Sequence, residues 1–143
     1  MTMVAILFFL AMQTADPAGL PAVAPVATEI GTVAAAPPPA ATAWTALAPL
    51  PWRAPPVLAP AMTEFVAAEV SSGRCAAPHP NVLSFDLAVR VAEGGRVSEV
   101  VPRAIGCPTV EQYAAGLVTG FARNNLRSPS SGWYRVAVSF TLA

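Results

Sequence analysis

The chain has 143 residues, of which 55% are hydrophobic, and its eight arginines balance eight acidic residues to a formal net charge of zero. A chain of this length holds at most one domain of ordinary size. It has no lysine and no basic patch along the sequence, which argues against nucleic acid as a partner.

An apolar run extends from Val4 to Met12. It is too short for a membrane-spanning helix, which needs about 20 residues, but it has the length of the apolar region of a secretory signal. We therefore predict a signal peptide over residues 1–15, cleaved near Ala15, and a periplasmic, exported protein that is soluble or weakly membrane-associated. No Lys or Arg precedes the run, so the alternative is a start site further upstream.

The segment 16–60 contains eleven of the sixteen prolines, among them Pro37-Pro38-Pro39 and Pro49-Leu50-Pro51. Proline lacks an amide donor and favours polyproline II. The composition therefore predicts a disordered Pro/Ala-rich linker that takes no part in a packed core. Trp44 and Trp52 are unusual in such a linker. They could dock onto the folded domain or onto a partner, or they could be linker residues without such a role.

The predicted folded domain covers residues 61–143 and begins with a short helix over Met62–Ser72. Thr63 is the expected N-cap, and Gly73 is expected to stop the helix. Phe65, Val66 and Val70 fall at helical spacing and would form its apolar side.

Two strands joined by a tight turn are expected next. Val82–Val91 alternates apolar and polar residues at period two, which is the pattern of a half-buried strand. Paired glycines in Glu93–Arg96 supply the positive φ that a hairpin turn needs. Val97–Val101 then returns as a second strand, and Pro102 indicates that this strand ends there or lies at an edge of the sheet.

A second helix is predicted over Val110–Leu126, with Thr109 as N-cap and Gln112 completing a capping box. Glu111 in the first turn suits the positive end of the helix dipole. The expected apolar stripe consists of Val110, Tyr113, Ala114, Leu117, Val118 and Phe121.

Gly116 and Gly120 weaken this second helix and would let it lie close to the sheet. A last strand, Tyr134–Leu142, again alternates at period two. Together these elements predict an α+β fold in which a small three-stranded antiparallel sheet is packed by a helix, in the order helix-β-β-α-β.

The only cysteines, Cys75 and Cys107, flank the first two strands. In a small exported domain they are expected to form one disulfide. The alternatives are free buried thiols, or redox or metal use together with His79. A structural zinc site would need a fourth ligand, so His79 is interpreted as an exposed bystander.

No arrangement of residues indicates catalysis. The pairs Ser71-Ser72 and Ser130-Ser131 have no histidine or acidic partner at a readable spacing, and no phosphate-binding loop is present. We therefore expect no enzyme, no cofactor, no metal and no small-molecule substrate.

The hairpin strand Gly95–Val101, the helix after it, the loop Leu126–Gly132 and the strand Val136–Phe140 follow one another in a specific order. In order and spacing they resemble the C-terminal domain of TonB-family energy transducers, with its Gly-x-Val-x-x-Val and Val-x-Val-x-Phe strands. The resemblance covers roughly residues 63–143, and the proline-rich segment before it is similar to the periplasm-spanning linker of that family. The family's Tyr-Pro pair and membrane anchor are not found, so TonB-like recognition is expected without energy transduction.

The resemblance implies a non-enzymatic protein that binds an extended peptide of an outer-membrane receptor or another envelope protein. A three-stranded sheet leaves open edges, so such a peptide could bind by strand addition. The last strand is the candidate edge, although it could equally serve packing alone. The alternative function is a stand-alone exported structural or homodimerising module that uses the same edge. The residues expected to form the partner-binding strand are Trp133, Arg135, Ala137, Ser139 and Thr141.

Overall fold

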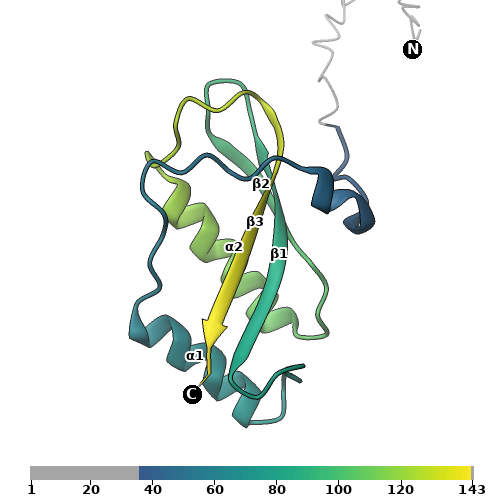
Figure 1. Cartoon of the computed structure of the whole chain (residues 1–143), viewed down its shortest axis with the longest axis vertical. Coiled ribbons are helices and arrows are strands. Elements are labelled where there is room, and N and C mark those ends of the chain that lie inside the picture. The colour runs from purple at the N-terminus through teal and green to yellow at the C-terminus, as the bar shows by residue number, and fades with distance from the viewer. Residues whose placement is uncertain (1–35, 143) are drawn as a thin grey trace, which may run out of the picture. The chain divides into compact units, whose positions relative to one another are not determined.

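The computed structural model describes residues 36–142 and has an α+β fold (Figure 1). Three antiparallel strands form one sheet in the order β2-β1-β3, so the first strand is central and the other two are edges. This confirms the predicted fold class. The predicted signal peptide and residues 16–35 of the predicted linker lie outside the described residues. The elements are η1 (Ala41–Ala46), α1 (Pro60–Ser71), β1 (Val82–Val91), β2 (Val97–Pro102), α2 (Pro108–Ala122) and β3 (Gly132–Thr141).

The core lies on one face of the sheet, where the two long helices cover it. Every second residue of β1, from Leu83 to Val91, is buried, as are Val136, Val138 and Phe140 of β3. They pack in one cluster with Val66 of α1 and with the buried side of α2. The period-two alternation of the sequence therefore marks the correct face of both strands. From α2 the buried residues are Val110, Glu111, Ala114, Ala115, Val118 and Ala122.

The turn between β1 and β2 forms as predicted. Gly94 and Gly95 adopt φ of 89° and 79°, a region in which side chains other than hydrogen are strained. The amide of Gly95 donates to the carbonyl of Ala92 over 3.1 Å, which closes the turn. Pro102 ends β2, and β2 is an edge strand, so both readings of this proline hold.

Both helices begin earlier than predicted, because a proline occupies the first helical position of each. Pro60 and Pro108 follow the N-caps Ala59 and Cys107, and neither N-cap makes a side-chain capping hydrogen bond. Proline fixes φ near the helical value and needs no amide partner there, so it favours this start. The predictions of Thr63 and Thr109 as N-caps are therefore wrong.

The predicted capping box of α2 is also wrong, and a neighbouring residue takes its place. Glu111, not Gln112, reaches back, and its Oε1 accepts a hydrogen bond from the amide of Ile105 over 2.9 Å. At its other end α2 stops at Ala122, four residues before the predicted end. Asn124 then takes a left-handed φ of 56°, which is a common way to end a helix.

Gly116 and Gly120 do not bring α2 close to the sheet. Both are exposed, and a Cβ built on either would have no atom within 4 Å. The expectation that these glycines let α2 pack closely against the sheet is therefore wrong. Two glycines on an open helical surface only weaken the helix.

We expect Gly120→Ala to raise the free energy of unfolding by about 0.5–1 kcal/mol, because alanine loses less backbone entropy in a helix. Denaturant unfolding of the parent and the variant measures this difference. Gly94→Ala is the matched control and should destabilise the protein, because its φ of 89° is strained for alanine. A loss of stability in Gly120→Ala would contradict this prediction, because the open space around Gly120 leaves room for a methyl group.

The predicted linker is packed against the domain from Trp44 onward. Trp44 and Leu50 are each only 3% exposed, and Trp52 packs against the core cluster. This corrects the expectation that residues up to 60 form a disordered linker. Of the two roles considered for the tryptophans, docking onto the folded domain is the one observed. The prolines leave enough free carbonyl and amide groups between them for the segment to bond to the sheet.

Candidate peptide-binding edge

The outward backbone groups of β3 can be assigned from one pair of hydrogen bonds. The amide of Arg135 donates to the carbonyl of Ala48 over 2.9 Å, and the amide of Leu50 donates to the carbonyl of Arg135 over 3.0 Å. Arg135 therefore directs its backbone away from β1. The register between β1 and β3 is uninterrupted over all ten residues, and backbone direction alternates along such a strand. The other outward residues are consequently Trp133, Ala137, Ser139 and Thr141.

A short piece of the N-terminal segment covers the first part of this edge. Residues 48–50, which we call the edge segment, lie parallel to β3, with Pro49 opposite Arg135. Leu50 is buried in the core cluster. Both backbone groups of Arg135 are consequently bonded to the edge segment and are not free to bind a partner. Arg135 is nevertheless among the partner-binding residues predicted from the sequence.

The edge segment is held in place by the loop after α2. The amide of Arg127 donates to the carbonyl of Pro51 over 2.8 Å. The amide and the Nε atom of Arg53 donate to the carbonyls of Asn125 and Leu126 over 2.7 and 2.8 Å. The side chain of Asn125 also bonds to both backbone groups of Ala54. These contacts make the edge segment a fixed part of the domain.

The second part of the β3 edge is open within the described residues. Ala137, Ser139 and Thr141 are exposed, and by the same alternation as at Arg135 their amides face away from β1. No residue outside the sheet is bonded to these amides within residues 36–142. On the outer face, the hydroxyl of Ser139 lies 2.7 Å from that of Ser84 on β1. We call Ala137–Thr141 the open edge. It presents unpaired backbone groups without a charged side chain of its own.

The outer face of the sheet is partly covered by η1. Arg103 lies 5.0 Å above the ring of Trp44 and donates from Nη2 to the carbonyl of Ala41 over 3.2 Å. It also pairs with Asp86 of β1 at 3.8 Å. Because of this cover Ala88, which points to the outer face, is completely buried. The part of the outer face beside the open edge, around Ser84 and Ser139, is exposed or half-exposed and could meet a ligand.

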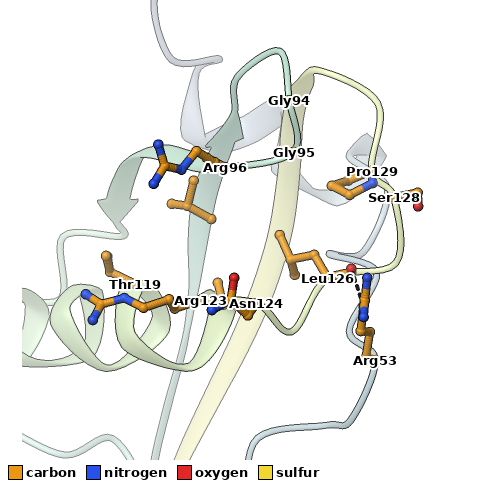
Figure 2. A pocket seen from close by; sticks show the side chains of 12 residues that line it. Arg53, Gly94, Gly95, Arg96, Thr119, Arg123, Asn124, Leu126, Ser128 and Pro129 are labelled. Atoms are coloured by element: carbon orange, nitrogen blue, oxygen red, sulfur yellow. Dashed lines mark hydrogen bonds between the residues drawn. The ribbon is translucent and has the colours of Figure 1, made fainter.

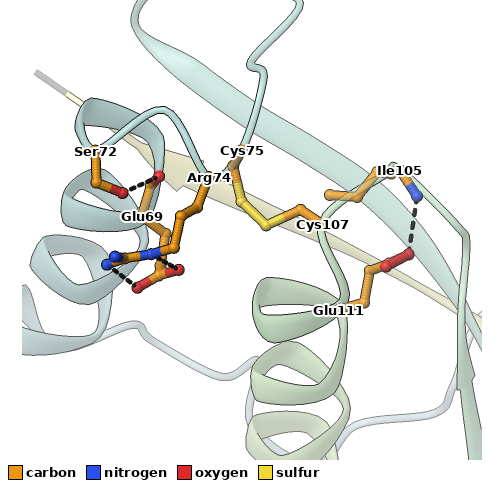
Figure 3. The surroundings of a disulfide bond; sticks show 7 residues. All are labelled: Glu69, Ser72, Arg74, Cys75, Ile105, Cys107 and Glu111. Carbon is orange, nitrogen blue, oxygen red and sulfur yellow. Dashed lines mark hydrogen bonds and ion pairs between the residues drawn. A yellow bond between two sulfur atoms is a disulfide. The ribbon is translucent and has the colours of Figure 1, made fainter.

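The predicted disulfide is present between Cys75 and Cys107 (Figure 3). Their Cα atoms are 5.2 Å apart, and both residues are buried. The bond joins the chain after α1 to the residue that precedes α2. Because both sulfur atoms are used in it, the alternatives of free thiols and of metal ligation with His79 do not apply to this form. His79 itself is exposed.

An ion pair lies beside the disulfide (Figure 3). Arg74 donates from Nε and Nη2 to the two carboxylate oxygens of Glu69, over 3.0 and 2.9 Å. This hydrogen bonding holds the pKa of the Glu69 carboxyl below its ordinary value, although desolvation acts in the opposite direction. The carbonyl of Glu69 also accepts the amide of Cys75. The pair therefore fixes the turn that leads into the disulfide.

The lowered pKa of Glu69 predicts a loss of stability in acid. The pair stabilises the fold above the ordinary glutamate pKa of about 4.3, and this contribution disappears as the pH falls through the lowered pKa. We expect Glu69→Gln to unfold at a lower temperature than the parent at neutral pH, with the difference vanishing in acid. Thermal unfolding across the pH range measures this. Glu64→Gln, an exposed change on the same helix, is the control, and equal behaviour of both variants would contradict the prediction.

Comparison with protein-family models, with curated proteins and with solved structures found no match to this chain. The described residues contain no helix that is long and apolar enough to span a membrane. A buried intramolecular disulfide is typical of proteins from oxidising compartments.

Sequence reasoning selected β3 but did not find the edge segment that divides it. The available signal was the presence of Trp44, Leu50 and Trp52 in a segment rich in small residues and proline. Large apolar side chains that recur in such a segment indicate docking onto a surface. Trp44 contacts Arg103, Leu50 bonds to Arg135 and Trp52 lies opposite Leu126, so only the fold reveals these distant partners.

Proposed function

We propose that this protein is a non-enzymatic binding module of the cell envelope that takes up an extended peptide as a fourth strand on the open edge. The observation that carries the proposal is the row of exposed, unpaired backbone groups at Ala137, Ser139 and Thr141. An extended peptide satisfies such groups with its own backbone, and this gives affinity without any side-chain constellation. A monomeric protein normally protects a strand edge, so an edge left open invites a partner.

The edge segment would define where the peptide begins. It already occupies Arg135, so an added strand would have the five residues of the open edge, roughly 17 Å of strand length. A peptide seated there would meet polar hydroxyls on the outer face, where Ser84 and Ser139 lie together. The site therefore favours peptides with small or polar side chains on one face.

The proposed partner is a segment of an outer-membrane receptor or of another envelope protein. The resemblance to TonB-family C-terminal domains supports this partner class, as do the predicted signal peptide and the disulfide, which fits the oxidising periplasm. Transduction of energy to the receptor is not part of the proposal. The proposed location is the periplasm.

The alternative is a homodimer through the same edge. Two copies related by a twofold axis at Ser139 would place Ala137 of one copy opposite Thr141 of the other. This isologous pairing would join two three-stranded sheets into a continuous sheet of six strands. The open edge carries no charged side chain, so two copies would meet there without repulsion between like charges.

Titration of the full chain with synthetic periplasmic segments of outer-membrane receptors, followed by calorimetry, tests the proposal. Binding of a segment in extended form, at millimolar affinity or better, is the expected result. Sedimentation of the protein without a peptide tests the alternative. A stable dimer that binds no segment would replace the peptide-binding proposal with the homodimer.

A further inference from the structure

A polar pocket lies at the end of the molecule where the β1–β2 hairpin meets the loop after α2 (Figure 2). Its volume of about 700 Å³ is in the range of small-molecule sites. Pro129 and Gly95 close it above, because a Cβ on Gly95 would lie 3.4 Å from the proline ring. Leu126 and the last turn of α2 form its floor. The open edge of β3 contributes no residue to this pocket.

Three arginines from distant parts of the chain line the pocket: Arg53, Arg96 and Arg123. Figure 2 shows Arg96 and Arg123 extended toward the same side, one from the hairpin and one from the end of α2, with Arg53 opposite. No aspartate or glutamate lines the pocket. It therefore carries three positive charges and no compensating carboxylate among its lining residues.

None of these three arginines is matched by a carboxylate, whereas three other arginines of the described residues are. Arg74, Arg90 and Arg103 each form an ion pair with a carboxylate. Within residues 36–142, Arg53, Arg96 and Arg123 form no ion pair. Arg53 is held in place by its Nε bond to the carbonyl of Leu126, which leaves the ends of its fork for another acceptor.

The dipole of α2 opposes the binding of an anion in this pocket, and its partial charge can be compared with the charge of the arginines. The C-terminal end of α2 points to the pocket and carries about half a negative charge. The amides of Arg123 and Asn125 bond to the carbonyls of Gly120 and Ala122, which reduces the exposure of these dipoles. Three full positive charges outweigh this partial charge, so the pocket favours an anion.

The pocket is also lined by the described residues other than glycine that have a positive φ. The two residues other than glycine with positive φ are Asn124, at 56°, and Ser128, at 31°, and both line it. Asn124 ends the helix, which explains its conformation. Ser128 directly precedes Pro129, which restricts its backbone, and strained backbone of this kind is concentrated at ligand sites.

We propose that this pocket binds a phosphate ester of a small polar molecule, with the phosphate held between Arg96 and Arg123. A tetrahedral phosphate accepts hydrogen bonds from several directions, which suits guanidinium forks that come from two elements. A carboxylate, by contrast, is bound by a single arginine fork, so it would not need two arginines. The volume exceeds what a phosphate group alone needs, and Arg53 on the opposite side would meet a polar group on the rest of the ligand.

Calorimetric titration of the full chain at low ionic strength tests this proposal, with glucose 6-phosphate, glucose and inorganic phosphate as probes. Saturable binding of glucose 6-phosphate is expected, with much weaker binding of inorganic phosphate and none of glucose. Arg96→Gln and Arg123→Gln should each weaken binding roughly tenfold, because each removes a charge-assisted contact. Arg127→Gln is the matched control. It changes the same charge on an exposed residue outside the pocket and should leave binding unchanged.

A second arm distinguishes a soluble ester from a lipid head group. Flotation with phosphatidylcholine vesicles, with or without phosphatidic acid, is carried out on the same proteins. Binding to phosphatidic acid alone, lost in Arg96→Gln and Arg123→Gln, would assign the phosphate to a lipid. No saturable binding to any of these probes would overturn the proposal. So would equal weakening by Arg127→Gln, which would indicate general charge attraction, or equal affinity for inorganic phosphate and the ester.

Discussion

Replacing Ser139 with proline is expected to abolish peptide binding while the domain stays folded. The amide of Ser139 faces away from β1, because the register is continuous from Arg135, whose amide bonds to Ala48. Proline at this position would remove a backbone donor that the sheet does not use. Edge strands tolerate proline where the amide faces solvent. Affinity for a receptor segment should therefore fall below detection, with little change in circular dichroism.

The neighbouring residue supplies the matched control. The amide of Val138 faces β1 under the same alternation, so Val138→Pro should break the central ladder and unfold the domain. Proline at Ala137 and Thr141 should behave like Ser139→Pro. Proline at Arg135 should instead release the edge segment, because its amide is used there. A Ser139→Pro protein that is folded and still binds peptide would remove the open edge as the binding site.

Removing the disulfide is expected to lower the free energy of unfolding by about 3–4 kcal/mol. Cys75 and Cys107 are separated by 32 positions and enclose β1 and β2, and the chain-entropy estimate for a loop of this length gives that value. The double change Cys75→Ala and Cys107→Ala avoids a free thiol and a buried hydroxyl. Urea unfolding of the parent, the reduced parent and the double variant measures the effect. The helices and strands should remain, because the core cluster contains many contacts besides the sulfur atoms.

Two results would contradict this account of the disulfide. Thiol titration of the denatured, unreduced protein should find no free thiol, and two free thiols would show that the bond does not form. A reduced parent that is as stable as the oxidised protein would show that the bond adds nothing to folding. Reduction and the double variant should agree closely, since both remove the same cross-link.

The elements of the fold could be predicted from local patterns in the sequence. The bounds of β1 agree at both ends, because its alternation over Val82–Val91 directs five apolar side chains to one face. The glycine pair fixed the hairpin, and the two cysteines had only each other as partners. The helices α1 and α2 were found with errors at their ends and in the packing expected of Gly116 and Gly120, and η1 was not foreseen. In the first turns of α1 and α2, a proline at the first position outweighed the threonines as a start signal.

The candidate sites depend on contacts that no local pattern contains. The prolines around Leu50 predict an extended segment without a core, but the free groups of Ala48 and Leu50 bond to Arg135. This pairing leaves only part of the β3 edge open. Likewise Arg53, Arg96 and Arg123 form no patch along the sequence, and the fold alone brings them to one pocket. The sequence by itself determined the strands, helices and disulfide, since periodicity and spacing act over short range. Which edge is free and where charge gathers were decided by the tertiary structure, because both depend on residues that are distant in the chain and adjacent in space.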